Sequence, residues 1–236
     1  MTTQKTLLAV ALPFALFSTS ALADWSATVT GASDYTFNGV SQTQNDPALQ
    51  GSLDYSFGES GMYAGTWASN VDFGDDTNIE WDAYFGRYAQ LNEALSIDYG
   101  LSYYSYHGQS NSSDGNYFEA YTKFGYASEL GQTELNFWYS WDYFGTGAGN
   151  VISMVAHTIE LAPNHALRAS FDISNSLDGD KYAWDGTDGK SYNHYRLAYQ
   201  TSFEGFDIEV AGENTSLDID TADERIVLLI GRTFSL

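Results

Sequence analysis

Apolar and polar residues alternate with a period of two along most of this chain. In residues 48–57, the odd positions hold Leu, Gly, Leu, Tyr and Phe, whereas the even positions from 50 to 56 hold Gln, Ser, Asp and Ser. Residues 95–103 and 134–144 repeat the alternation. Successive side chains of a strand point to opposite faces, whereas a helix would spread the polar residues around its circumference. The pattern therefore predicts strands with one apolar face and one polar face.

Repeated along the chain, the alternation predicts twelve strands. They span residues 25–40, 48–57, 62–73, 78–89, 95–106, 116–127, 133–144, 150–161, 166–176, 191–202, 206–216 and 224–236. Each is near the roughly 9–11 residues that a tilted strand needs to cross a bilayer.

The connections between these segments alternate between tight turns and loops that are mostly longer and more polar. Residues 58–61 and 203–205 are tight turns, and residues 107–115 and 177–190 are long loops. This arrangement is typical of outer-membrane barrels, and an even strand number puts both termini on the periplasmic side. We therefore predict an all-β fold, a transmembrane antiparallel β-barrel of twelve strands. A soluble β-sandwich also alternates along its strands, but its strands are shorter and its apolar face does not carry Tyr and Trp at the ends.

The last residues of the chain fit the closing strand of such a barrel. Phe234 and Leu236 follow Gly231 and share one face of an extended strand. We expect Phe234 and Leu236 to point at lipid and, together with Gly231, to form the closure signal that presents this strand to the machinery that inserts barrels.

The first 23 residues have the features of a secretory signal peptide. Lys5 supplies a positive charge, residues 7–17 are apolar, and residues 21–23 form a small-x-small cleavage site. The apolar stretch is short for a membrane span, which argues against the alternative of an N-terminal anchor helix. We predict that residues 1–23 are removed and that residues 24–236 form the barrel.

The composition adds aromatic residues and negative charge. The chain holds 18 Tyr, 14 Phe and 6 Trp, and Tyr and Trp are favoured at membrane interfaces. It has no Cys, so disulfides and thiol chemistry are excluded. Its formal net charge of -22 argues against nucleic acid as a partner, because phosphate binding needs a basic surface. An acidic total can also serve solubility, so the positions of the acids decide what it means.

The faces of the strands can be assigned because apolar side chains must meet the lipid outside a barrel and polar ones its interior. The predicted pore-lining acids are Asp34, Asp54, Asp72, Glu80, Asp82, Asp98, Glu119, Glu134, Asp142, Glu160, Asp172, Asp207, Glu209 and Glu213, and the predicted pore-lining bases are Lys123, Arg168, Arg196 and Arg225. In residues 62–73 the same rule puts Tyr63 and Trp67 outside. The excess of acids predicts a lumen that favours cations. The aromatic residues expected to narrow it are Tyr84, Tyr88, Tyr104, Tyr121 and Trp138.

Several spaced motifs in the first half of the chain resemble a known family. They are SDYTFNGVSQT at residues 33–43, PALQG at 47–51, GMYAGTWASNV at 61–71 and IEWDAYFG at 79–86. In this order they resemble the TorF family of putative porins, whereas the rest of the chain agrees in pattern only. The family usually has an Arg two residues before its Gly-Ile/Val-Ser motif, and this chain has Thr-Phe-Asn ahead of Gly39. The resemblance implies an outer-membrane barrel with a channel function and no catalytic site.

The sequence gives little support for a catalytic site. A surface hydrolase of the barrel class needs Ser, His and an orienting group together on the outer face. No Ser stands in a His-x-Ser arrangement with His157, the one His that could face lipid. His107 and His165 fall in connections, and His194 is expected inside, beside Arg196. We therefore predict that the protein is not an enzyme.

Candidate metal and nucleotide motifs are equally weak. The acidic runs at residues 72–76, 177–180 and 185–189 offer the oxygen ligands that Ca²⁺ takes, but none has the EF-hand spacing. Weak cation binding in these loops stays open. The glycines of residues 145–149 lack the strand-to-helix context of a nucleotide loop. We predict no cofactor and no resident metal.

The sequence therefore predicts a porin of a Gram-negative outer membrane that lets small hydrophilic solutes diffuse passively, with a preference for cations. The expected partners are outer-membrane lipid, small hydrophilic solutes or cations, and the barrel-assembly machinery, with no role for nucleic acid. The alternatives are a substrate-specific channel for a cationic or sugar-like solute, a closed barrel that serves structure or surface binding, and a surface hydrolase. The solute, the oligomeric state and the presence of an inward-folded loop stay open.

Overall fold

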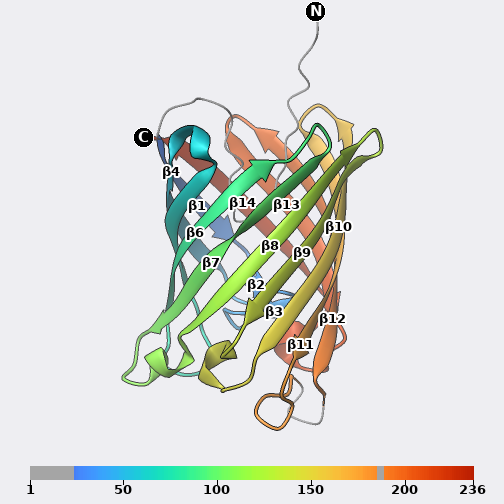
Figure 1. Cartoon of the computed structure of the whole chain (residues 1–236). Coiled ribbons are helices and arrows are strands. Elements are labelled where there is room, and N and C mark those ends of the chain that lie inside the picture. Colours follow the sequence, from blue (N-terminus) through green and yellow to red (C-terminus); the bar gives the residue numbers. More distant parts are fainter. Residues whose placement is uncertain (1–23, 185–188) are drawn as a thin grey trace, which may run out of the picture.

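Twelve long antiparallel strands close into a barrel in the part of the chain that the structure, a computed structural model, describes: residues 24–184 and 189–236 (Figure 1). The order around the barrel is β1-β14-β13-β12-β11-β10-β9-β8-β7-β6-β5-β4, so β1 closes it between β14 and β4. The predicted fold class and strand number are confirmed. The predicted signal peptide, residues 1–23, and residues 185–188 of the acidic run 185–189 lie outside the described residues.

The strand boundaries are close to the predicted ones. The barrel strands are β1 (Asp24–Ala32), β4 (Ala48–Ser56), β5 (Met62–Asn70), β6 (Ile79–Gln90), β7 (Leu95–His107), β8 (Tyr117–Ser128), β9 (Gly131–Ser140), β10 (Asn150–Ala162), β11 (His165–Ser176), β12 (Ser191–Phe203), β13 (Phe206–Thr215) and β14 (Arg225–Ser235). A short hairpin between β1 and β4 adds β2 (Thr36–Phe37) and β3 (Val40–Ser41). Single 3-10 turns lie in four connections: η1 (Gly58–Ser60), η2 (Ser112–Gly115), η3 (Tyr143–Gly145) and η4 (Asp220–Ala222). No helix among the described residues is long and apolar enough to span a membrane.

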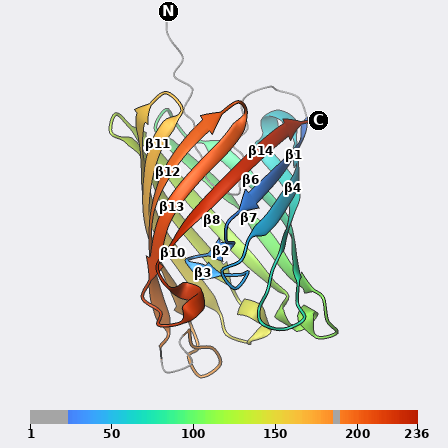
Figure 2. The same ribbon diagram turned by 180° about the vertical axis from the view of Figure 1, so that it is seen from behind.

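The two ends of the barrel differ. At one end β1 begins beside the end of β14, with Ser26 opposite Ser235, and short turns join the strands. We call this the turn end. The opposite end carries the longer connections that follow β5, β7, β9, β11 and β13, and we call it the loop end (Figures 1 and 2).

The outer surface of the barrel is apolar, as the alternation predicts. On β4, Leu49 and Leu53 are 66% and 38% exposed, and the outward positions of β14 continue this surface. Aromatic groups stand at both ends of it: Trp25 packs on Tyr55 at the turn end, and Phe118 stacks on Trp141 at the loop end. This distribution matches the apolar band and aromatic girdles of membrane barrels. Phe234 and Leu236 lie on this exposed face, and Gly231 lies on the buried inner face.

The predicted faces of residues 62–73 were wrong. Tyr63 and Trp67 are buried inside the barrel, at 5% and 9% exposure, and not in contact with lipid. The strand ends at Asn70, so Asp72 is an exposed loop residue whose carboxylate accepts from the Gly74 N–H. The even positions of β5 are Met, Ala, Thr, Ala and Asn, which are uncharged and small enough to meet lipid. The rule that sends aromatic residues outward failed because Tyr and Trp also line polar interiors through their polar edges.

Two further predicted strands were too long. In the segment predicted at 25–40, the barrel strand ends at Ala32. The chain after it bends inward and enters the lumen. The segment predicted at 133–144 ends at Ser140, so Asp142 is a residue of the β9–β10 connection and not of the wall. The Asp142 carboxylate accepts from the Gly147 N–H at 2.7 Å and closes that loop.

Candidate functional site

A cavity of about 300 Å³ lies inside the barrel. Its wall takes side chains from β4 through β14 and from residues 34–39. The predicted pore-lining residues that border it are Asp34, Asp82, Lys123, Glu134, Arg168, Arg196, Glu209 and Glu213. The predicted residues that join this network through hydrogen bonds on the inner face are Asp54, Glu80, Asp98, Glu119, Asp172 and Arg225. The structure therefore brings most of the predicted charges together in one lumen.

Besides Asp72 and Asp142, two further predicted charges lie apart from this network. Asp207 is exposed at the turn end of β13, where it accepts from the Ser202 hydroxyl at 2.7 Å. Glu160 is exposed near the turn end of β10. Neither touches the cavity, so any effect they have on a solute is confined to the barrel entrance.

Residues 33–47, which we call the inward segment, fold from the end of β1 into the lumen and carry the hairpin of β2 and β3 (Figure 2). The turn of this hairpin is Asn38-Gly39, with φ of 49° and 80°. Both values lie in the left-handed region, which Asn and Gly adopt most readily. A side chain at position 39 would meet Thr215 Cγ2 at 2.5 Å, so glycine is also required for the close approach to β13.

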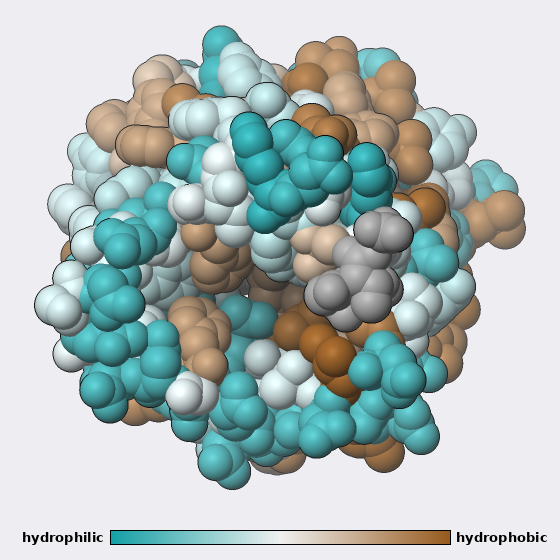
Figure 3. All heavy atoms as spheres, turned by 90° about the horizontal axis from the view of Figure 1, so that it is seen from below, coloured by the Kyte–Doolittle hydropathy of each residue, from teal (hydrophilic) through white to brown (hydrophobic). Residues whose placement is uncertain are grey.

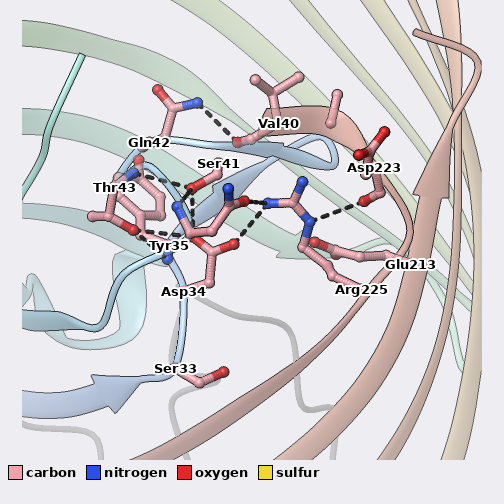
Figure 4. Close-up of polar contacts among 12 residues, drawn as sticks. Ser33, Asp34, Tyr35, Val40, Ser41, Gln42, Thr43, Glu213, Asp223 and Arg225 are labelled. Carbon is pink, nitrogen blue, oxygen red and sulfur yellow. Dashed lines mark hydrogen bonds and ion pairs between the residues drawn. The ribbon is translucent and has the colours of Figure 1, made fainter. Parts of the chain in front are cut away.

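An ion pair fixes the base of the inward segment to β14 (Figure 4). Arg225 of β14 donates to the Asp34 carboxylate at 2.7 Å, and the two side chains are only 11% and 7% exposed. Asp34 also accepts from the hydroxyls of Ser41 and Thr43 at 2.6 and 3.0 Å. Arg225 adds a second bond to the Asn45 side chain at 2.8 Å. These contacts tie both legs of the hairpin to the barrel wall.

The tip of the inward segment is anchored on the far wall. The Asn38 amide donates to Asp172 of β11 at 2.9 Å, and the Tyr192 hydroxyl of β12 donates to the Asn38 carbonyl at 3.1 Å. Tyr35 packs edge-on against Trp67 with ring centroids 5.3 Å apart. The segment therefore crosses the lumen and narrows it at the height of the cavity.

On the wall formed by β9 through β13, carboxylates are paired with bases, and we call this the arginine side. Its contacts are Arg168–Glu134 at 3.0 Å, Arg196–Glu209 at 2.6 Å, Arg196–Glu213 at 3.1 Å and His194–Asp172 at 2.8 Å. Each guanidinium lies beside at least one carboxylate. Because charges of opposite sign neutralise each other, the two arginines and one histidine offset most of the charge of the four carboxylates on this wall.

On the wall formed by β4 through β8, carboxylates are held by tyrosine hydroxyls, and we call this the tyrosine side. The pairs are Tyr84–Asp54, Tyr63–Asp98 at 2.7 Å, Tyr104–Glu119 at 2.9 Å and Tyr106–Glu80 at 3.2 Å. The base on this wall is Lys123, whose ammonium lies 5.0 Å from the Tyr121 ring centre. A hydroxyl satisfies a carboxylate but brings no positive charge. The negative excess of the lumen is therefore concentrated on the tyrosine side.

Aromatic residues from several loops crowd the loop end. Tyr143 and Phe144 of η3 pack with Tyr106 and Tyr117 of the wall, and Tyr182 joins them from the β11–β12 connection. Burial raises the pKa of Tyr182 to about 12 and raises the pKa of Tyr143 as well, so both phenols stay neutral at physiological pH. Figure 3 looks into this end and shows a hollow mouth with hydrophobic side chains on its inner wall and hydrophilic ones around the rim.

The histidines have local polar partners. His157 lies 3.0 Å from the Thr133 hydroxyl, His165 lies 2.6 Å from the Tyr199 hydroxyl, and His107 lies 3.1 Å from the Ser105 hydroxyl. None of these hydrogen bonds joins a histidine to both a serine and a carboxylate. Within residues 24–184 and 189–236, no group of three or more His, Asp and Glu side chains is placed to hold a metal ion.

Sequence reasoning missed the inward segment and the inward-facing aromatic residues of β5. The Asn38-Gly39 dipeptide is a strong turn signal inside the predicted strand 25–40, and it marks the hairpin tip. For β5, the even positions carry no charge, so that face can meet lipid. This was the signal that Tyr63 and Trp67 could face inward.

A closed antiparallel barrel of this kind also occurs in solved porin structures. Similar solved structures are the NanC porin, with a TM-score of 0.60 at 12% identity over 88% of this chain and 98% of that one, and the KdgM porin, with 0.59 at 9% identity over 89% and 99%. A second KdgM structure, in complex with disordered oligogalacturonate, has a TM-score of 0.57 at 11% identity over 89% and 99%. At these identities the likeness concerns the fold.

The chain belongs to a family described as bacterial protein of unknown function (Gcw_chp), whose model matches residues 18–234. A comparison with curated proteins finds no match.

Proposed function

We propose that this protein is an outer-membrane channel through which small hydrophilic solutes diffuse passively, with a preference for cations. The observation that carries the proposal is the cavity of about 300 Å³ inside a closed barrel, bordered by charged side chains. A barrel that serves only as a scaffold gains nothing from burying so many charges, because each costs free energy to remove from water. In a channel the same charges face the solute.

The sign of the preference follows from the tyrosine side. Carboxylates such as Asp54 and Glu80 are bonded to tyrosine hydroxyls, which bring no positive charge to them. The inward segment narrows the lumen, so a passing ion stays within the screening distance of about 8–10 Å in physiological salt. Fixed negative charge at that range raises the local cation concentration and lowers the anion concentration.

The remaining parts of the proposal concern location and assembly. Residues 1–23 would direct export, both termini would face the periplasm, and the barrel would sit in the outer membrane of a Gram-negative bacterium. Phe234 and Leu236 would meet lipid and guide insertion by the barrel-assembly machinery. The resemblance to the TorF family of putative porins supports the same class. No catalysis, cofactor or nucleic acid enters this function.

The test is the reversal potential of the full-length protein, inserted in a planar bilayer that separates two KCl concentrations. We expect a potential whose sign reports K⁺ preference. Replacing Asp54 and Asp98 together with Asn should reduce that preference. The matched control replaces the loop acids Asp178 and Asp180, and it should change the potential less. Anion preference in the unmodified protein would contradict the proposed selectivity.

A closed barrel is the second candidate, because the inward segment is anchored to both walls of the lumen by Arg225 and by Asp172. A protein that inserts and shows no conductance at any voltage would favour this candidate over the channel.

A further inference from the structure

One carboxylate of the tyrosine side has no hydroxyl to hold it. Asp82 of β6 is 8% exposed and borders the cavity. Its Oδ1 atom is buried and has no hydrogen-bond partner within residues 24–184 and 189–236. A buried acceptor without a donor costs free energy, so a solute that brings a donor to this atom would be bound there.

Aromatic residues flank Asp82 on both sides. Trp67 is its direct cross-strand neighbour on β5, and Tyr104 is its direct neighbour on β7. Directly opposed residues on adjacent strands have Cβ atoms about 4.5–5.5 Å apart. Tyr84 stands two residues further along β6 on the same face, and Tyr35 packs on Trp67 from the inward segment. All five residues border the same cavity.

The tyrosine hydroxyls of this group are already engaged. Tyr104 donates to Glu119 and Tyr84 donates to Asp54. These two hydroxyls therefore donate to other carboxylates, and around Asp82 the two tyrosines contribute only their rings. A carboxylate framed by aromatic rings is complementary to a positively charged organic group, because the faces of the rings attract cations.

We propose that this pocket, formed by Asp82, Trp67, Tyr104, Tyr84 and Tyr35, binds a small organic cation that carries N–H donors, such as a guanidinium or primary ammonium compound. The inference rests on the proposed channel function and names its solute class. A bare metal ion fits less well, because hard cations require six or more oxygen ligands, and the described residues offer no group of three acids and histidines placed for one. An anionic sugar fits less well, because the bases of the arginine side already face carboxylates.

The experiment uses methylguanidinium as the probe and methylurea as its neutral isostere. The full-length channel in a planar bilayer carries a K⁺ current, and each compound is added at increasing concentration. We expect saturable block by methylguanidinium and none by methylurea. Tetramethylammonium, which has the charge but no N–H donor, should block more weakly. Equal block by methylurea, or block by methylguanidinium that does not saturate, would overturn the inference. If the channel still conducts K⁺ in that case, the proposed function stands.

Variants locate the site. Asp82→Asn should weaken the apparent affinity about tenfold or more, because hydrogen bonds to a charged group are the strong ones. Trp67→Leu should weaken it roughly two- to tenfold through loss of ring–cation attraction. The matched control is Asp207→Asn, an exposed acid at the turn end, which should leave affinity unchanged. An unchanged affinity in Asp82→Asn would overturn the assignment.

A second readout keeps binding separate from conduction. Trp67 and Trp138 both border the cavity, so tryptophan fluorescence of the detergent-solubilised protein should change saturably with methylguanidinium. Should the protein conduct nothing, the channel proposal fails, and this titration still decides whether the pocket binds the cation. If Asp82→Asn does not give heat-modifiable barrel, Trp67→Leu and the comparison of methylguanidinium with methylurea decide whether the pocket binds the cation.

Discussion

Replacing Arg225 with Gln should release the inward segment from the barrel wall. Removing one partner of a buried ion pair costs about 3–5 kcal/mol. Here Asp34 keeps its two hydroxyl donors, Ser41 and Thr43, so we expect a cost below this range, about 2–3 kcal/mol, for undocking. At about 1.4 kcal/mol for each factor of ten, the undocked population should rise about 30- to 140-fold.

The natural absence of cysteine makes this measurable. A single cysteine at Gln42, which is 8% exposed within the segment, should react with a thiol reagent only when the segment leaves its site. When undocking is fast relative to labelling, the labelling rate follows the undocked population. The rate in Gln42→Cys should therefore rise by the same factor when Arg225→Gln is added. A cysteine at Asp46, exposed in the same segment, should label equally fast in both backgrounds.

Two further variants guard this reasoning. Arg232→Gln removes an arginine of the outer face that lies over the Phe206 ring, and it should leave labelling at position 42 unchanged. Adding Asp34→Asn to Arg225→Gln removes the charge left without its partner, so the double variant should label more slowly than Arg225→Gln alone. An unchanged rate in Arg225→Gln, or an equal rise in Arg232→Gln, would refute the role of the ion pair.

Three other predictions follow from single features of the chain. Gly39→Val should undock the inward segment and raise single-channel conductance, because a side chain there meets Thr215 Cγ2 at 2.5 Å, whereas Gly31→Val, with nothing within 4 Å, should do neither. N-terminal sequencing of outer-membrane material should give Asp24, and material that starts at Met1 would contradict the predicted cleavage. Deleting residues 234–236 should abolish insertion, and normal amounts of heat-modifiable barrel after the deletion would refute a role for this end in assembly.

Most of the barrel could be predicted from alternation because the lipid outside imposes it. A position such as Leu49 or Leu53 must be apolar, and the residue between two such positions is free to be polar. The rule needs only local sequence, so strand number and most boundaries followed from it. The charged residues of β6 through β9 followed as well, since an isolated Asp or Lys inside an apolar alternation has one acceptable face.

The same rule failed where hydrophobicity does not decide the face. Tyr63 and Trp67 are amphipathic, and inside this barrel Tyr63 bonds to the Asp98 carboxylate at 2.7 Å. The sorting of the lumen into a tyrosine side and an arginine side was also beyond the sequence. Pairs such as Tyr63–Asp98 or Arg225–Asp34 join strands that are far apart along the chain, and closure of the barrel is what brings them together.

The first of the motifs that resemble the TorF family, residues 33–43, lies in the inward segment. This overlap has a physical reason. A barrel strand tolerates many sequences, because any residue of the right polarity serves at each position. The inward segment instead needs Asp34 for Arg225, hydroxyls at positions 41 and 43 for Asp34, and Gly39 where no side chain fits. A recognisable sequence is therefore expected where specific contacts shape the lumen.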